Sequence, residues 1–331
     1  MKAAIYKNYG PPEVVQLAEV EKPSPKNNEV LIKVHATTVN RTDTGFRSAE
    51  YFISRFWSGL LKPKNQILGN EFAGVIESTG KDVKLLKAGD KVFGYNDKTF
   101  GAHAEYMVMD EEGALATMPE NISFEEAAAI TEGSHYALCD IRAAKIIEGQ
   151  SVLINGTTGA IGSAAVQIIK YLGAEVVAVC DTKNVELVKS LGADVVIDYK
   201  KEDFTTLNKK FDFIFDAVGK SSYGKCKPLL KEKGIYISTE LGYMGQNPFL
   251  AMITPLFGGK KLLFPIPTIS KEDVNYSKDL VVAGKFKPVI DKIYSLNEIV
   301  EAHKYVETGM KTGNVIINIA GTSAPLSHRI S

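Results

Sequence analysis

The sequence predicts an α/β protein with a strand-rich first third and a parallel, doubly wound sheet after it. Three observations lead to this fold class. Short β-prone segments separated by Gly, Pro, Asn and Asp fill the first third. From Ser123 onward, strand-like and helix-like segments alternate as in a βαβ series. The apolar run Ser151–Asn155 leads into three glycines and then into a helical pattern. A chain of 331 residues is long enough for two domains.

The first third has the strand pattern of a small β barrel or sandwich. Val30, Ile32 and Val34 recur at every second position, which is typical of a half-buried strand. The predicted strands are Lys2–Tyr6, Val14–Val20, Glu29–Val34, Ala73–Ser78 and Lys91–Phe93.

The rest of the chain begins with a helix over Phe124–Ile130, for which Ser123 and Glu126 form a capping box. The elements that follow are strands Ser151–Asn155, Glu175–Cys180, Val195–Ile197, Phe211–Phe215 and Ile235–Ser238, with helices Ile161–Leu172 and Val185–Leu191. Met244–Thr268 is interrupted by Pro and Gly, which predicts a poor helix and an uncertain strand at Leu262–Phe264. Val315–Ile319 is a last strand, and we expect Thr322–Ser331 to be a loose tail.

The glycine turn carries the strongest functional signal. Gly156 permits a tight turn, Gly159 lets a pyrophosphate approach the backbone, and Gly162 lets helix and strand pack closely. The intervening Ala160 and Ile161 begin the helix, whose free N–H groups attract phosphate. The pattern predicts a dinucleotide-binding site.

Composition excludes several classes of partner. Lys+Arg and Asp+Glu both total 39, so charge favours neither nucleic acid nor an anionic membrane. No apolar run reaches membrane-spanning length, and the N-terminal residues resemble a strand rather than a signal peptide. Three dispersed cysteines without a CxxC pair suit a reducing compartment, so we expect a cytoplasmic location.

Several blocks resemble the medium-chain dehydrogenase/reductase superfamily, and among its branches the zinc-independent quinone oxidoreductases. They are Gly69-Asn-Glu-Phe-Ala-Gly-Val-Ile76, Ala88-Gly-Asp-Lys-Val92, Phe100-Gly-Ala-His-Ala-Glu-Tyr106, Leu191-Gly-Ala-Asp194, Ile197-Asp-Tyr199 and Asp216-Ala-Val-Gly219. The resemblance implies a GroES-like catalytic domain (1–123 and 270–331) and a Rossmann NAD(P)-binding domain (124–269), with the active site between them. It also implies a homodimer formed through an edge strand near Leu262–Phe264.

Two departures from the zinc alcohol dehydrogenases decide the branch. Asn40 stands where they carry a Cys, and Asn70 stands where they carry a His. Their four-cysteine structural zinc lobe is also missing. A neutral amide is a poor zinc ligand, so we expect no zinc. Hydride transfer to a quinone or an α,β-unsaturated carbonyl needs no Lewis acid, and this reaction on a small hydrophobic substrate is the predicted function.

The resemblance places Asn40 near the nicotinamide, where its amide would donate to the substrate oxygen; the alternative is an Asn that only satisfies a turn. Tyr51 is a second candidate donor, with a wall or lid role as its alternative. Asp43 is expected to fix the loop, and His103 to be structural.

Other positions are expected to bind the cofactor. By resemblance, Tyr136 lies by the nicotinamide amide, unless it is a core residue of a helix. Thr158 would contact the pyrophosphate, and Gly219 would admit the nicotinamide ribose. Asn314 stands where relatives often place a Lys near the cofactor.

The preference between NADPH and NADH rests on conflicting signals. Asp181 follows the second strand at the distance where an acidic residue accepts from the ribose 2′-OH, which favours NADH. Lys183 and Tyr199 match features of NADPH-using relatives. We favour NADPH.

Two other functions remain open at this point. An enoyl-thioester reductase would need a basic mouth, which Lys62, Lys64 and Lys261 do not form convincingly. A nucleotide-binding relative that has lost its chemistry is the second. Binding of AU-rich RNA, known for some relatives, is disfavoured by the balanced charge.

Overall fold

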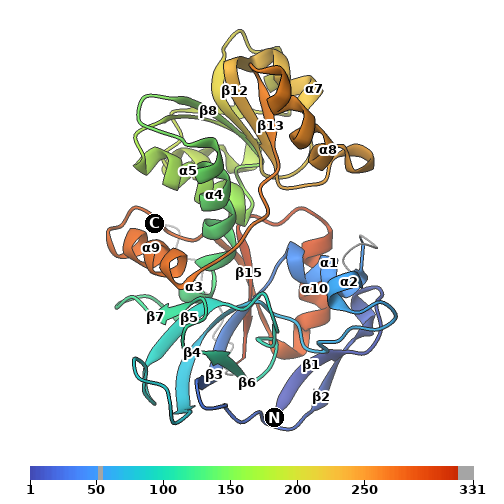
Figure 1. The fold of residues 1–331 in the computed structure, drawn as a ribbon, viewed down its shortest axis with the longest axis vertical. Helices are drawn as coiled ribbons and strands as arrows, with labels where there is room; N and C mark the ends of the chain where they lie inside the picture. Colours follow the sequence, from blue (N-terminus) through green and yellow to red (C-terminus); the bar gives the residue numbers. More distant parts are fainter. Residues whose placement is uncertain (51–54, 320–331) are drawn as a thin grey trace. The chain divides into compact units, whose positions relative to one another are not determined.

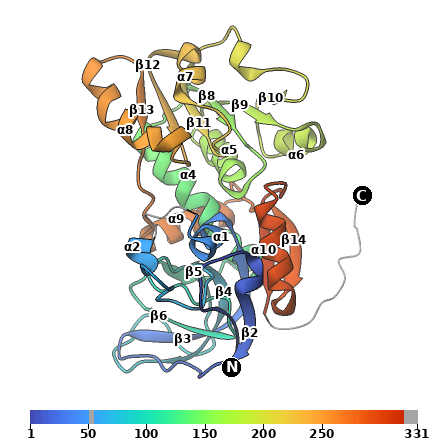
Figure 2. The same ribbon diagram turned by 90° about the vertical axis from the view of Figure 1, so that its right-hand side faces the viewer.

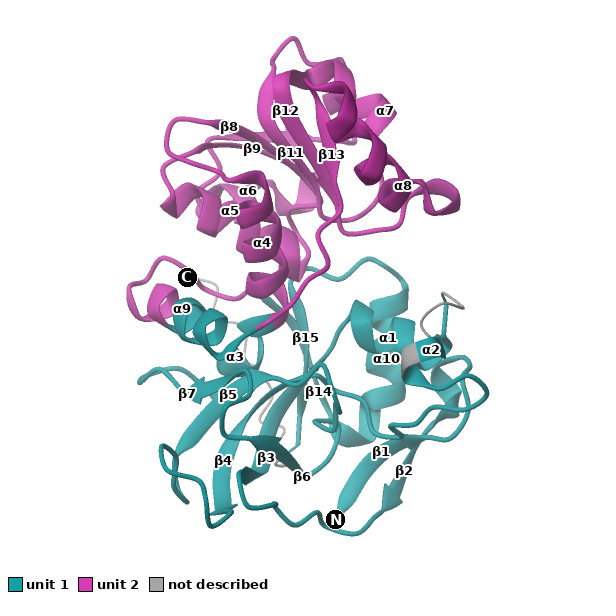
Figure 3. Cartoon of the chain, in the orientation of Figure 1, with its two compact units in different colours: residues 1–131, 270–278, 290–331 teal, residues 132–269, 279–289 magenta. Residues whose placement is uncertain are grey.

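The computed structural model describes residues 1–50 and 55–319, and these form two compact units (Figures 1 and 3). Unit 1 comprises Met1–Thr131, Ser270–Lys278 and Ile290–Ser331, and unit 2 comprises Glu132–Ile269 and Asp279–Val289. Each unit is therefore assembled from segments that are distant in the sequence.

Unit 1 is built on an antiparallel sheet in the order β14-β15-β3-β4-β5-β7, with β6 also paired to β3 and only the β14–β15 pair parallel. Its strands are β3 (Glu29–Val39), β4 (Glu71–Thr79), β5 (Lys91–Tyr95), β6 (Tyr106–Asp110), β7 (Leu115–Thr117), β14 (Ile290–Ser295) and β15 (Asn314–Asn318). A separate antiparallel pair joins β1 (Lys2–Tyr6) to β2 (Val15–Glu19). The strand-rich character predicted for this region is confirmed.

The helices of unit 1 are short. They are α1 (Arg41–Ser48), α2 (Arg55–Ser58), α3 (Phe124–Ala128), α10 (Ile299–Glu307) and the first part of α9 (Lys271–Val282). The core between α10 and the sheet includes Ile299, Ala302 and Val306 against Val315 and Ile317. Figure 2 shows α10 alongside β14. This packing holds the end of β3 against the rest of the unit.

The predicted division at residue 123 falls before α3, whereas unit 1 extends to Thr131. The reason is that α3 packs on β3 and β4 of unit 1. Ser123 caps this helix in the predicted capping box with Glu126.

Unit 2 holds a six-stranded parallel sheet in the order β10-β9-β8-β11-β12-β13. Its strands are β8 (Ser151–Asn155), β9 (Glu175–Cys180), β10 (Val195–Asp198), β11 (Phe211–Asp216), β12 (Leu230–Ser238) and β13 (Lys261–Leu263). Its helices are α4 (Thr131–Ala144), α5 (Ala160–Tyr171), α6 (Val185–Ser190), α7 (Tyr223–Cys226) and α8 (Gln246–Ile253). The predicted doubly wound parallel sheet is confirmed, because the chain runs outward from β8 to β10 and then returns to β11.

The expectation of a poor helix after Met244 is wrong over Gln246–Ile253, which forms α8. Pro248 lies in the first turn of this helix, where a missing backbone N–H breaks no intrahelical bond. Single turns of 3₁₀ helix lie at Pro12–Val14, Thr182–Asn184, Phe204–Thr206, Lys227–Leu229, Tyr243–Gly245, Thr254–Phe257 and Leu296–Glu298. Within the described residues, every helix is too short or too polar to span a bilayer.

Candidate active site

The carboxyl ends of β8 and β11 meet at the point where the strand order of unit 2 reverses. In open parallel sheets, ligands bind in the crevice outside this point. Asn155 ends β8 and Asp216 ends β11, and Asn155 Nδ2 donates to Asp216 Oδ1 over 3.0 Å. Both side chains are buried. This hydrogen bond ties together the two strands from which the glycine turn and the Gly219 loop emerge.

Two of the three turn glycines are required by packing. Gly156 has φ +85°, and a Cβ there would overlap the side chain of Val218. A Cβ at Gly162 would overlap the carbonyl oxygen of Gly156. The buried Thr157 fixes the turn by donating from Oγ1 to the Val179 carbonyl over 3.0 Å. The tight turn and close packing predicted for these glycines are present.

Gly159 differs from the other two glycines. It is the N-cap of α5 with an ordinary φ of −72°, and no atom lies within 4 Å of a Cβ built on it. No side chain of the described residues caps the helix. The N–H groups of Ala160, Ile161 and Gly162 form its first turn and have no intrahelical acceptor. Beside the half-buried Thr158, this end of α5 is open to an anionic ligand.

The residues predicted to select the cofactor also lie at the carboxyl edge. Asp181 follows β9, is half-buried, and accepts a hydrogen bond from Asn184 Nδ2 over 2.6 Å. Lys183 and Tyr199 are exposed, with Tyr199 directly after the neighbouring strand β10. The strand ends are tied together because Thr182 Oγ1 donates to Asp198 Oδ2 over 2.7 Å.

Two further predicted positions lie in unit 2. Gly219 has φ +64° after β11, and a Cβ there would overlap Glu240. Tyr136 lies on α4, half-buried, with its ring 4.6 Å from that of His135. One turn before it, a Cβ on Gly133 would come within 2.5 Å of the Ala160 carbonyl oxygen. The first part of α4 therefore packs closely on the start of α5.

In unit 1, Asn40 follows β3 and is the N-cap of α1. Its Oδ1 accepts from the Asp43 N–H over 3.0 Å, and Asp43 Oδ2 accepts from the Asn40 N–H over 3.1 Å. The turn-satisfying interpretation of Asn40 is therefore correct for its side-chain oxygen. The side-chain nitrogen is used differently.

Asn40 Nδ2 donates to Asn70 Oδ1 over 2.7 Å, and Asn70 Nδ2 donates to the Tyr95 hydroxyl over 2.8 Å. Asn70 directly precedes β4 and Tyr95 ends β5, and these strands pair with Glu71 opposite Tyr95. All three side chains are nearly inaccessible to solvent. A line of three hydrogen-bonded polar groups thus crosses the ends of β3, β4 and β5.

The Asp43 carboxylate holds the backbone on either side of this line of hydrogen bonds. Its Oδ1 accepts from the Gly69 N–H over 3.0 Å, so one carboxylate holds both Asn40 and the residue before Asn70. Burial raises the pKa of Asp43, while the charge of His103 and the two backbone N–H groups act to lower it. His103 Nε2 lies 2.8 Å from the Thr38 carbonyl oxygen, so this nitrogen carries the proton that it donates. Both side chains thus make hydrogen bonds to backbone groups within unit 1.

Asn314 lies at the same edge of unit 1 as Asn40. β15 pairs with β3 so that Val315 lies opposite Val39. The Asn314 side chain is buried, and its Nδ2 is 3.5 Å from the Ala129 carbonyl oxygen. Tyr51 lies outside the described residues. Tyr95 was not predicted from the sequence, because only strand pairing brings it beside Asn70.

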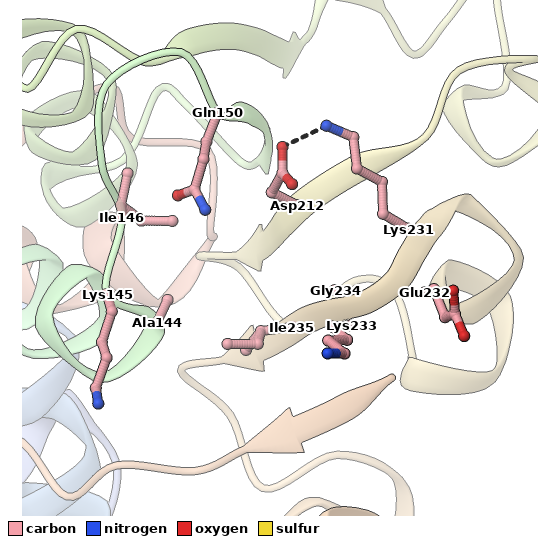
Figure 4. A pocket seen from close by; sticks show the side chains of 10 residues that line it. All are labelled: Ala144, Lys145, Ile146, Gln150, Asp212, Lys231, Glu232, Lys233, Gly234 and Ile235. Carbon is pink, nitrogen blue, oxygen red and sulfur yellow. Dashed lines mark hydrogen bonds and ion pairs between the residues drawn. The ribbon is translucent and has the colours of Figure 1, made fainter. Parts of the chain in front are cut away.

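A pocket of about 490 Å³ in unit 2 has none of the turn glycines in its lining, and Figure 4 shows the side chains that line it. It is formed by the residues before β8, the start of β11 and the first half of β12, which are amino ends of strands. Its Asp212 is paired with Lys231 over 2.6 Å. The cofactor crevice predicted for such sheets is at the opposite, carboxyl edge. Among the described residues, no cluster of three or more His, Cys, Asp or Glu is placed to hold a metal ion.

Comparison with known proteins identifies the family. A model of the alcohol dehydrogenase GroES-like domain matches residues 26–120, and a model of a zinc-binding dehydrogenase matches residues 191–317. The 2-methylene-furan-3-one reductase of Solanum lycopersicum is 34% identical over 96% of this chain and 79% of its own length. The chloroplastic NADPH-dependent alkenal/one oxidoreductase of Arabidopsis thaliana is 31% identical over the same shares.

The solved structure of the quinone oxidoreductase from Coxiella burnetii is similar with a TM-score of 0.86 and 28% identity, covering 96% of this chain and 99% of that one. The two sequence relatives and this solved structure each match nearly the whole of this chain. The chain therefore belongs to the quinone oxidoreductase-like branch of the medium-chain dehydrogenase/reductase superfamily.

Proposed function

We propose that this protein is an NAD(P)H-dependent reductase that transfers hydride to a quinone or an α,β-unsaturated carbonyl compound. The observation that carries the proposal is the start of α5, where the first-turn N–H groups have no intrahelical acceptor and nothing lies near a Cβ built on the N-cap Gly159. The family supports it, since its members named above act on alkenals, enones or quinones. These names favour quinone or enone reduction over the thioester reductase and non-catalytic alternatives.

When bound, the nicotinamide supplies a hydride and is oxidised. The acceptor gains the hydride at carbon, and its π electrons move to the conjugated oxygen. The chain's contribution is to hold that oxygen with a hydrogen-bond donor and to keep the site ordered. We assign this donor to Asn40, because among the described residues Asn70 accepts only one of its two Nδ2 hydrogens. The final proton comes from water.

The reaction is proposed to need no zinc. The positions at which the zinc alcohol dehydrogenases carry Cys and His are here Asn40 and Asn70, whose amides bond to each other. Zinc binds thiolate, imidazole or carboxylate in preference to such amides. The nearby Glu71 carboxylate already accepts from the hydroxyls of Thr38 and Thr131, over 2.6 and 3.0 Å. The residues present do not fit a catalytic zinc ion.

We further propose NADPH as the preferred cofactor. One oxygen of the Asp181 carboxylate already accepts from Asn184 Nδ2, which holds that side chain beside α6. Lys183 and Tyr199 are exposed beside it, and a lysine in this place suits a 2′-phosphate. The chloroplastic relative named above is NADPH-dependent.

We propose that the protein forms a homodimer through β13 and the exposed apolar surface next to this strand. β13 is the edge strand of the sheet, with β12 as its only neighbour within the described sheet. Exposed apolar side chains of the adjacent segments are Phe249, Met252, Leu256 and Phe257, each more than 60% exposed. Exposed apolar patches of this kind mark interfaces. Light scattering that gives the mass of a monomer at working concentration would contradict this proposal.

The function is tested by following cofactor oxidation with NADPH and NADH against a panel of quinones and enones, with and without a metal chelator. We expect the chelator to leave turnover unchanged. At low cofactor concentration, turnover should be faster with NADPH than with NADH. Tight cofactor binding without turnover of any acceptor would contradict the proposed reaction. Loss of turnover on chelation, restored by zinc, would contradict the metal-free mechanism.

A further inference from the structure

The hydrogen bonds around Asn40 determine which way its amide faces. The Asp43 backbone N–H can only donate, so the Asn40 atom bonded to it is the oxygen. The other atom, Nδ2, is therefore the one that faces Asn70. An amide that is free to flip would present either atom to a substrate, and this one is not free to flip.

The same reasoning extends to the next residue. Asn40 Nδ2 is a donor, so the Asn70 atom facing it must be Oδ1. Asn70 Nδ2 then faces the Tyr95 hydroxyl, which accepts its proton over 2.8 Å. The orientation set by one backbone N–H is thus passed along three side chains that are almost completely buried.

We propose that Asn70 and Tyr95 are positioning residues that act through Asn40: the Asp43 N–H sets which way the Asn40 amide faces, and Asn70 and Tyr95 hold it there, so that its remaining N–H is directed toward the substrate oxygen. This inference rests on the proposed reductase function. Hydrogen-bond donors that are already oriented stabilise developing negative charge without reorganising during the reaction. The buried line formed by Asn40, Asn70 and Tyr95 orients such a donor. Two of its residues, Asn40 and Asn70, occupy the positions where the zinc dehydrogenases carry metal ligands.

This line of three hydrogen-bonded side chains, Asn40, Asn70 and Tyr95, acts as an orienting relay, and the relay makes a specific prediction for paired substitutions. Asn40→Ser keeps an oxygen to cap α1 but removes the side-chain N–H. Asn70→Ala removes the acceptor that holds Asn40, and Tyr95→Phe removes the hydroxyl at the far end of the line. We expect Asn70→Ala to lower kcat about tenfold, a typical effect of one hydrogen bond. Tyr95→Phe should lower kcat by a smaller factor.

In the Asn40→Ser background, both substitutions should lose most of their effect on kcat, because the N–H that they orient is gone. The affinity for NADPH should be unchanged in all variants. The shape of the kcat against pH profile should also be unchanged, since the relay orients the donor and transfers no proton. Tyr305→Phe is the matched control: it removes a phenol hydrogen bond to Asp291 elsewhere in unit 1 and should leave kcat at the wild-type value.

Kinetics are compared only among variants whose melting temperature shows a folded protein. If Asn70→Ala does not fold, the comparison of effects in the wild-type and Asn40→Ser backgrounds is made with Tyr95→Phe alone. Equal fold-losses of kcat in the wild-type and Asn40→Ser backgrounds would overturn the relay while leaving the proposed reaction standing. A shifted pH profile in Tyr95→Phe would also overturn it, since Tyr95 would then be a proton donor. A wild-type protein that reduces no quinone or enone would overturn both proposals.

Discussion

The glycine turn of unit 2 and the amide line of unit 1, the two regions proposed to meet ligands, are built in opposite ways. The turn uses backbone: Gly159 leaves space, and the N–H groups at the start of α5 are not capped by any side chain. The amide line uses side chains, and Asn40, Asn70 and Tyr95 are each held by another polar group. A backbone site depends on the absence of atoms at a few positions. A side-chain site depends on partners supplied by separate strands.

The largest effect is expected from adding a methyl group to the turn. Gly162→Ala places a Cβ against the Gly156 carbonyl, and backbone cannot move aside cheaply, so stability should fall by about 3 kcal/mol or more. Gly159→Ala is the matched control, since nothing lies near its Cβ. It should unfold like the wild type but bind NADPH more weakly. Denaturant unfolding and cofactor titration measure both; equal stability losses in the two variants would break the distinction between packing and binding glycines.

The two units also differ in how they treat a buried carboxyl, and this difference is expected to dominate the pH dependence. In unit 1, Asp43 accepts two backbone N–H groups. In unit 2, Asp140 on α4 is 4% exposed and accepts no hydrogen bond from the described residues, and burial raises its pKa to about 8.

Because the folded state keeps Asp140 protonated while the unfolded chain ionises it, the stability that Asp140 contributes falls as pH rises from about 4 to about 8. Asp140→Asn should therefore become more stable than the wild type over this interval, with a gap that grows up to about pH 8 and is constant above it. Unfolding free energies at several pH values check this. A gap independent of pH would show that Asp140 ionises freely in the folded protein.

Asn40 both caps α1 and is the proposed donor to the substrate oxygen. Substitutions here are expected to have effects of intermediate size, and they can separate the effect on stability from the effect on turnover. Asn40→Ala removes the cap of α1 and the free N–H, so stability should fall by about 1 kcal/mol and turnover should fall as well. Asn40→Ser restores a capping oxygen only. Its stability should recover while its turnover stays low. If turnover recovers with stability, the amide N–H has no part in the reaction.

The smallest effect is expected at Asp181, at the edge of the proposed nucleotide site. Asp181→Ser removes a negative charge next to Lys183, and we expect the affinity for NADPH to rise and that for NADH to fall. A change of about tenfold in their ratio corresponds to ~1.4 kcal/mol. Titration with both cofactors measures it. A wild-type protein that already prefers NADH by more than about tenfold would contradict the proposed cofactor.

The sequence by itself determined the parts of the molecule that depend on neighbouring residues. The glycine spacing predicted the turn and the start of α5 within one residue of its observed position, and alternating apolar runs predicted β8 to β12. Local patterns suffice here because a tight turn, a cap and a buried strand each depend on a few consecutive positions. The resemblance to the zinc alcohol dehydrogenases, and not a local pattern, identified Asn40 and Asn70 as departures from a zinc site.

Only the tertiary structure decided what these amides do instead. Tyr95 joins them because β4 and β5 pair with Glu71 opposite Tyr95, and no sequence spacing between residues 40, 70 and 95 indicates this. Asn314 lies at the same edge for a similar reason, through the pairing of β15 with β3. The orientation of an amide depends on whether its neighbours donate or accept, and those neighbours are brought together only when distant strands align.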